Sequence, residues 1–137
     1  MATTPEVLPH MDAVQAALTA VGLTVYVGGT PAGNGWTAPD KFAVLYPDPG
    51  MARCESLADE RTDFDSTMQI TCVGGDPVRA LWVADRVRRA LAAPLAVQGR
   101  ACWPAEDLGG PPLARDDDVT PPLFYVPVQY RICSTPA

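Results

Sequence analysis

Apolar residues recur every three or four positions in two stretches of the chain, which is the spacing of one face of an α-helix. The first stretch covers about Pro9–Val21, and Gly22 follows it as a residue suited to a left-handed helix cap. The second covers Pro77 to about Ala93, with Asp76 placed to cap the first turn. The pattern therefore predicts two amphipathic helices.

Other segments alternate between apolar and polar residues, which predicts β-strands with one covered face. The alternation is clear between residues 67 and 72 and again in Leu123–Ser134. Pro127 removes one ladder donor from the last segment, so this strand is expected at an edge or with a bulge. Residues 51–63 have no clear period, and we expect a short strand and a connecting loop there. The predicted strands are 23–28, 41–47, 67–72, 95–104 and 123–134.

The order of these elements predicts an α+β fold, in which a mainly antiparallel sheet carries two helices packed on one face. The other face of the sheet is expected to be wet, because alternate residues of the strand at 67–72 are polar. With 137 residues the chain has the length of a single domain, spanning 1–137. Fifteen prolines and eleven glycines predict long loops, at about 29–40 and 105–122.

One face of the second helix is small and apolar, as expected for a helix lying flat on a sheet. Val78 and Trp82 point the other way, beside Arg89. Either a loop folds over Trp82, or the ring marks a contact between subunits, where tryptophans concentrate. The candidate interface residues are Trp82, Val78, Arg89 and, in the first long loop, Trp36.

The glycine corner "VGGDPVRAL" before the second helix matches neither the dinucleotide fingerprint nor the phosphate-binding loop. Asp76 would also place a carboxylate where a phosphate would have to sit. The one histidine, His10, is expected to lie free at the surface, so no base is positioned for nucleophilic catalysis. We therefore expect a helix cap at this corner and no catalytic or cofactor site in the chain.

Candidate metal ligands lack a suitable spacing. Cys54, Cys72, Cys102 and Cys133 are far apart and have no histidine beside them, so they are expected to act as small buried hydrophobes. The run Asp116–Asp118 lacks the pattern of a calcium loop and is interpreted as a solvated loop. No metal site is predicted, and the chain is not expected to be an enzyme.

Sixteen acidic residues against ten basic ones give a formal charge of −6, which argues against binding to nucleic acid. The arginines at 86, 88 and 89 are interpreted as part of a solvated helix face. The N-terminus lacks the features of a signal peptide, and no stretch is apolar enough for a membrane span. We therefore expect a protein that is made in the cytoplasm and has no membrane partner.

Four features in order resemble the tail terminator, or tail completion, proteins of long-tailed bacteriophages, especially those infecting actinobacteria. They are the amphipathic helix "MDAVQAALTAVG", the strand "FAVLYP", the strand–corner–helix segment "DFDSTMQITCVGGDPVRALWVADRVRRAL", and the closing strand "LFYVPVQYRICS". The resemblance spans about Val7–Ser134.

This resemblance implies a structural subunit that assembles as a homo-oligomer, in a hexameric ring, at the neck end of the virion tail tube. The ring would stop polymerisation of the tail-tube protein and present a surface to the head-completion (stopper) protein. DNA would pass through it without specific binding, and the two long loops would reach neighbouring subunits or the tube.

Other functions remain open at this point. A head–tail connector or stopper protein would also be built from a small subunit with long loops, so the sequence does not distinguish it from a tail terminator. A small ligand-binding α+β domain would need a pocket, which the sequence places near Arg100, Trp103 and Tyr125. A cytoplasmic adaptor for a cellular partner is a third alternative.

Overall fold

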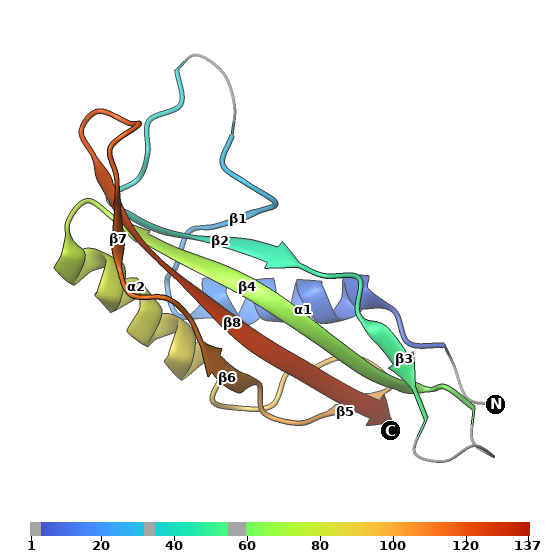
Figure 1. Ribbon diagram of the computed structural model, residues 1–137. Coiled ribbons are helices and arrows are strands. Elements are labelled where there is room, and N and C mark those ends of the chain that lie inside the picture. The colour runs from blue at the N-terminus through green and yellow to red at the C-terminus, as the bar shows by residue number, and fades with distance from the viewer. Residues whose placement is uncertain (1–3, 32–34, 55–59) are drawn as a thin grey trace.

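The computed structural model describes residues 4–31, 35–54 and 60–137. A single sheet has the strand order β1-β2-β4-β8-β5, with β3 paired to β4, and with β6 and β7 both paired to β8 (Figure 1). All pairs are antiparallel except β1 with β2. The elements are α1 (Val7–Ala20), β1 (Val25–Val27), β2 (Lys41–Pro47), β3 (Met51–Arg53), β4 (Asp63–Gly74), α2 (Pro77–Ala90), β5 (Arg100–Cys102), β6 (Glu106–Gly109), β7 (Ala114–Asp116) and β8 (Leu123–Pro136).

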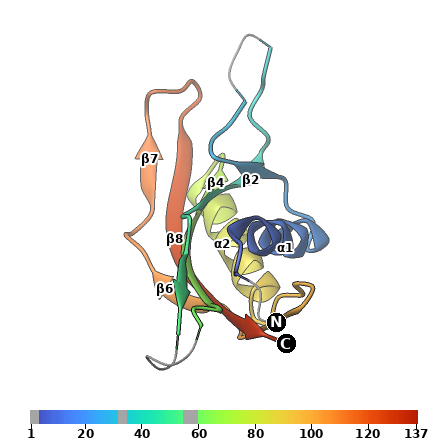
Figure 2. The same cartoon turned by 90° about the vertical axis from the view of Figure 1, so that its right-hand side faces the viewer.

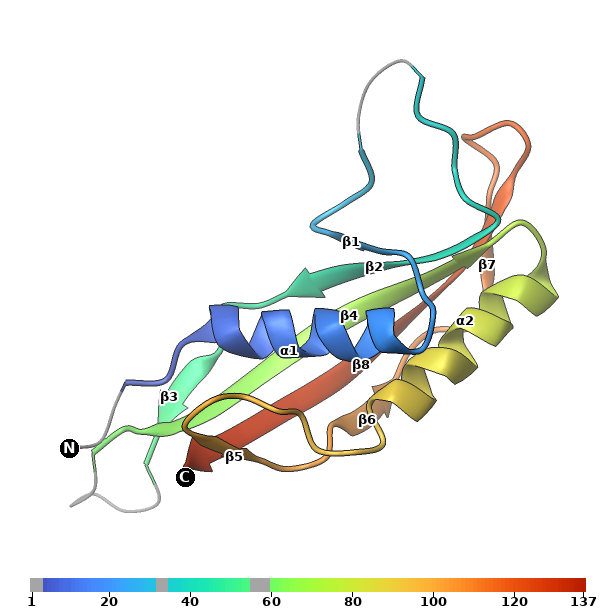
Figure 3. The ribbon, with the colours of Figure 1, turned by 180° about the vertical axis from the view of Figure 1, so that it is seen from behind.

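Both helices pack on the same face of the sheet (Figures 2 and 3), so the predicted α+β class with two helices on one face is confirmed. The helices meet this face over alternate residues of the long strands, and Met68, Ile70 and Cys72 of β4 are fully buried there. The side chains that α2 contributes to the core are small, which lets the helix lie close to the sheet. They are Ala80, Val83, Ala84 and Val87.

The glycine corner is a helix cap, as the sequence predicts. The Asp76 carboxylate accepts a hydrogen bond of 2.8 Å from the backbone N–H of Arg79. Gly74, the last residue of β4, lies so close to the first turn of α2 that a Cβ atom there would overlap the backbone N of Ala80. At Gly75 a Cβ atom would meet only ordinary van der Waals neighbours. Of the two glycines, Gly74 is therefore the one that the packing requires.

The expected loop at 105–122 is wrong in part, because β6 and β7 lie within it. Both strands pair with the outer side of β8, which is 14 residues long and offers backbone groups to neighbours along its length. All four residues of β6 are exposed, so its sequence carries no alternation. The predicted strand at 95–104 shortens to β5, and the irregular stretch after residue 50 begins with β3.

β8 lies inside the sheet, between β4 on one side and the short strands on the other, so the prediction of an edge strand is wrong. The missing N–H of Pro127 is nevertheless accommodated. On the outer side of β8, pairing with β6 ends at Gln129 and pairing with β7 begins at Tyr125. Pro127 falls in this gap, where the carbonyl oxygen lies against Gly110.

We expect Gly74→Ala to lower the free energy of unfolding by about 1–3 kcal/mol, because the new methyl group would overlap the backbone of α2. Gly75→Ala is the matched control and should change it by less than about 0.5 kcal/mol. Urea unfolding of the two variants measures the difference. Equal effects at both positions would contradict the close approach of β4 to α2.

Candidate subunit interface

The outward face of α2 surrounds Trp82, one of the predicted interface residues. The indole ring is partly buried and packs against the main core. Lys41, the first residue of β2, places its Nζ atom 4.0 Å from the ring centroid, and the Arg86 Cζ atom lies 4.6 Å from the same centroid. Both distances are within the range of a cation–π contact.

Val78 and Arg89 lie on the same stripe of α2 as Trp82, at helical spacings of four and seven residues. Val78 has 76% of its surface exposed and Arg89 is also exposed. Leu81, which the sequence reasoning did not single out, is 50% exposed beside them. We call the set Lys41, Val78, Trp82, Arg86 and Arg89 the basic α2 patch.

The cations of the basic α2 patch differ from the other arginines of the helix. Arg79 pairs with Asp40 at 2.9 Å, and Arg88 pairs with Asp107 at 3.2 Å. In the described part of the chain, no carboxylate lies within 4.0 Å of the charged groups of Lys41, Arg86 or Arg89. The patch thus carries positive charge that no described carboxylate of the chain pairs with.

The structure separates Trp36 from the other three candidates. Trp36 packs in an aromatic cluster on the sheet face opposite the helices, edge-to-face with Tyr26 and Phe42 at centroid distances of 5.9 and 6.1 Å. Phe42 and Val44 are buried in this second cluster, together with Val73. The expectation that the sheet face opposite the helices is exposed to solvent is therefore wrong at this end of the sheet.

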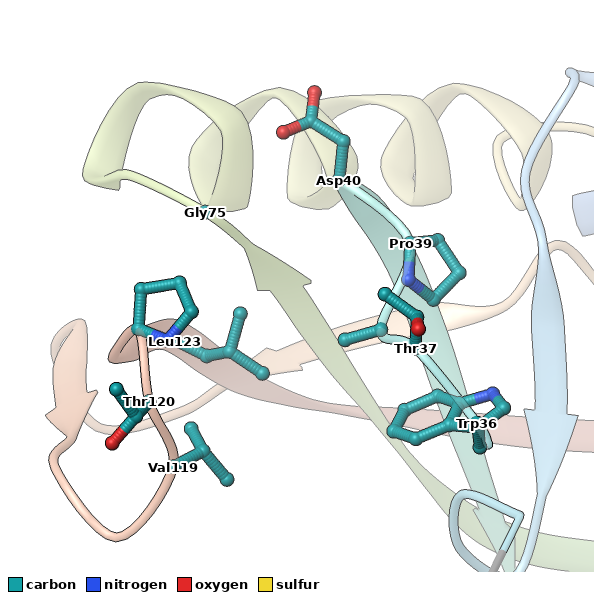
Figure 4. A pocket seen from close by; sticks show the side chains of 10 residues that line it. Trp36, Thr37, Pro39, Asp40, Gly75, Val119, Thr120 and Leu123 are labelled. Carbon is teal, nitrogen blue, oxygen red and sulfur yellow. The ribbon is translucent and has the colours of Figure 1, made fainter. Parts of the chain in front are cut away.

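A cavity of about 570 Å³ lies beside the aromatic cluster (Figure 4). Trp36 and Pro39 line one side, and Val119, Thr120 and Leu123 line the other. The lining is mostly apolar, and the Asp40 carboxylate at its rim is the partner of Arg79. The cavity shows that the segment before β2 and the turn before β8 lie together at one end of the sheet.

The pocket that the sequence places near Arg100, Trp103 and Tyr125 does not form. Arg100 is paired with Pro136 at the end of β8, and the Trp103 N–H donates to the carbonyl of Cys133. Tyr125 lies near the start of β8, where it is paired with Ala114. The three residues therefore stand at opposite ends of one strand.

The expectation of a free surface histidine is wrong, since His10 is 1% exposed and stacks on Phe64 at a centroid distance of 4.1 Å. The Glu6 carbonyl can only accept a hydrogen bond, so the His10 Nδ1–H donates to it at 2.7 Å. Nε2 then accepts from the Ser134 hydroxyl at 2.7 Å. The Ser134 oxygen in turn accepts from the Arg100 Nε–H at 3.0 Å.

This chain of hydrogen bonds ties α1 to the end of β8 and is not arranged as a catalytic site. Ser134 is fully buried, and both His10 and Arg100 hold its hydroxyl. The small cleft beside His10 is lined by residues before and within the first turn of α1 and by residues leading into β5, including Arg100, and Ser134 is not among them. Burial, above all, lowers the pKa of His10, and the Arg100 charge lowers it further. The neutral imidazole is the form that fits this site.

The acidic and thiol groups do not gather into a metal centre in the residues that the structure describes. Asp65 receives two hydrogen bonds from Arg131, at 3.0 and 2.7 Å, and these lower the pKa of the carboxyl group. Cys72 is fully buried, as predicted, and burial raises the pKa of its thiol to about 12. The expectation of burial is wrong for the remaining cysteines, since Cys54, Cys102 and Cys133 are partly exposed.

The aspartate run forms part of a β-turn. Asp116 ends β7, and its carboxylate accepts a 3.0 Å hydrogen bond from the backbone N–H of Asp118. Asp117 pairs with Arg115 at 2.7 Å. The three carboxylates therefore shape an exposed turn between β7 and β8.

No protein-family model matches the sequence, and no curated protein gives a significant match. Solved structures do match. A chain from the virion of a native gene transfer agent particle superposes with a TM-score of 0.61 and 16% identity, over 93% of this chain and 94% of that chain. A virion chain thus shares this fold. A second solved chain, which carries no functional name, gives a TM-score of 0.57 at 19% identity, over 91% of this chain and 95% of that one.

At these identities the comparisons establish the fold and nothing finer. Neither helix in the described ranges is long and apolar enough to cross a membrane.

The buried histidine predicts a specific pH dependence of stability. Because the pKa of His10 in the folded protein lies below its ordinary value of about 6.5, its contribution to stability is complete above that pH and is lost as the pH falls below it. Urea unfolding between pH 8 and 5.5 should show this loss in the wild type and a flatter profile in His10→Gln. His10 is the only histidine, so identical profiles would contradict its burial as the neutral form.

Proposed function

We propose that the protein is a structural subunit of a phage-like virion, and that it acts as a tail terminator. The subunits would form a hexameric ring at the neck end of the tail tube, end the polymerisation of tube protein and present a surface to the head-completion (stopper) protein. The observation that carries the proposal is the fold shared with a virion chain over 93% of this chain and 94% of that one. It agrees with the resemblance to tail terminators in the order of the sequence elements.

The surface of the subunit supports assembly with other copies. A ring needs two different surfaces on each subunit that complement each other. The outward face of α2 exposes Val78 and Leu81 beside cations that have no ion pair with a described residue, whereas the chain as a whole carries a charge of −6. Exposed apolar side chains bordered by charge are typical of a protein interface.

The end of the sheet that holds the cavity supports contacts beyond the ring. The segment before β2 and the hairpin of β7 and β8 extend from this end (Figure 1). In the proposed ring they would reach the tube or a neighbouring subunit, as expected of the long loops. The acidic balance would let DNA pass through the ring without specific binding, because like charge repels the phosphates.

We propose no catalytic activity and no cofactor for this subunit. Both ring nitrogens of His10 form structural hydrogen bonds, and the Ser134 hydroxyl beside the ring is buried. Shape, self-association and surface charge are the properties that the described residues offer.

The proposal predicts a closed ring. Native mass spectrometry of the purified protein, alone and with its tail-tube protein, should show a hexamer, and negative-stain microscopy should place that ring at one end of the tube. Adding the protein to polymerising tube protein should also shorten the tubes. A monomer under both conditions would contradict the proposal, and a ring that leaves tube length unchanged would instead favour a connector or stopper.

Two substitutions separate assembly from folding. Val78→Ser alters a residue that is 76% exposed, so the free energy of unfolding should change by less than about 0.5 kcal/mol while ring formation weakens. Trp82→Ala removes a partly buried ring and should cost about 1–3 kcal/mol of stability in addition. Rings that form normally in Val78→Ser would exclude this face of α2 from the interface.

A further inference from the structure

We propose that the basic α2 patch binds the acidic turn of a second copy of this chain, where the acidic turn is Asp116, Asp117, Asp118 and Val119. The inference rests on the proposed ring and goes further, since it names the two surfaces that meet. It also differs from the sequence interpretation, which treated both charge clusters as solvated.

The distribution of charge is the first observation. α2 holds four arginines and one aspartate, which gives the helix a charge of +3. Since the whole chain carries −6, the remaining residues together carry −9. The helix is thus a positively charged element on an acidic subunit, and charge complementarity at close approach favours contact between this helix and an acidic part of a second copy.

The arrangement around Trp82 is the second observation. The ring has Lys41 at 4.0 Å and Arg86 at 4.6 Å from its centroid, and Arg89 lies one helical turn beyond Arg86. Two cations therefore flank one partly buried aromatic ring, a third lies further along the same stripe of the helix, and none of the three has a carboxylate partner within the described residues. A group of carboxylates placed over this patch would relieve the repulsion between the like charges.

The acidic turn has the complementary pattern. Arg115 neutralises Asp117 in part, whereas Asp116 and Asp118 have no ion pair among the described residues. Val119 follows at once and is 39% exposed. An exposed valine thus stands beside carboxylates on this surface, as Val78 stands beside cations on the other.

The two surfaces belong to different sides of the subunit. α2 covers the helix side of the sheet, whereas β7 lies on the opposite side of β8 (Figures 2 and 3). A contact between them in two copies is heterologous and propagates from subunit to subunit until a ring closes. A symmetric contact of α2 with α2 would instead place cations against cations.

Charge reversal tests the pairing. Arg86→Glu/Arg89→Glu reverses the patch, and Asp117→Lys/Asp118→Lys reverses the turn. Each variant alone should lose ring formation, with self-association at least about tenfold weaker, because like charges then face each other. An equimolar mixture should recover an alternating ring, because each reversed surface meets an opposite charge in the other variant.

Asp12→Lys/Glu60→Lys is the matched control, since it changes two exposed carboxylates elsewhere and shifts the net charge as much as the reversed turn does. This control should assemble like the wild type. Circular dichroism and urea unfolding of every variant establish that the monomer is folded, and native mass spectrometry with tail-tube protein present measures assembly.

Normal rings from both reversed variants, or a mixture of folded variants that fails to recover rings, would overturn the pairing and leave the proposed function standing. A wild type that never forms rings would overturn the proposed function itself. If Arg86→Glu/Arg89→Glu loses retention on duplex DNA and still forms rings, the patch faces nucleic acid and the pairing is overturned as well.

Discussion

The long antiparallel ladder between β4 and β8 is the constraint on which the other elements depend. It runs from Phe64 paired with Ser134 to Gly74 paired with Phe124. Because side chains alternate along both strands, this register decides which residues meet the helices and which face the other side. A shift of β4 by one residue would turn Asp65 toward the core and expose Met68, which is fully buried. The ladder also places Gly74, and hence the start of α2, at one end of the sheet, and Ser134, which receives His10, at the other.

The sequence predicted the elements whose side chains are buried and missed those that are exposed throughout. Both helices, β4 and β8 bury residues at regular spacings over most of their length, and β2 is a short apolar run, so all five could be recognised. β6 is exposed throughout, and no pattern of side chains could reveal it. Its pairing follows from the unpaired backbone of β8, which is a property of the assembled sheet.

Two residues show what a closer use of spacing could have found. His10 stands four residues before Val14 and eight before Leu18, on the stripe of α1 that is buried. A polar residue on such a stripe indicates a buried hydrogen-bonded group, as His10 is. Likewise, residues 42–45 of β2 form an unbroken apolar run, which is typical of a strand covered on both faces. The helices cover one face of this strand, and the aromatic cluster with Trp36 covers the opposite face. The position of Trp82 between Lys41 and Arg86 could not be predicted, because Lys41 reaches it from a strand distant in sequence.

The separation of charge between α2 and the rest of the subunit has a consequence for assembly. A chain whose net charge is −6 repels other copies at long range, which opposes aggregation of the free protein. At contact distance, attraction exceeds this repulsion only where a positive surface of one copy faces a negative surface of another. The distribution of charge would therefore also select the orientation in which two copies approach. Screening by salt weakens both effects over about 8–10 Å. Because the cations around Trp82 border a partly buried ring, a contact made there would also exclude water and would depend less on salt than an exposed ion pair.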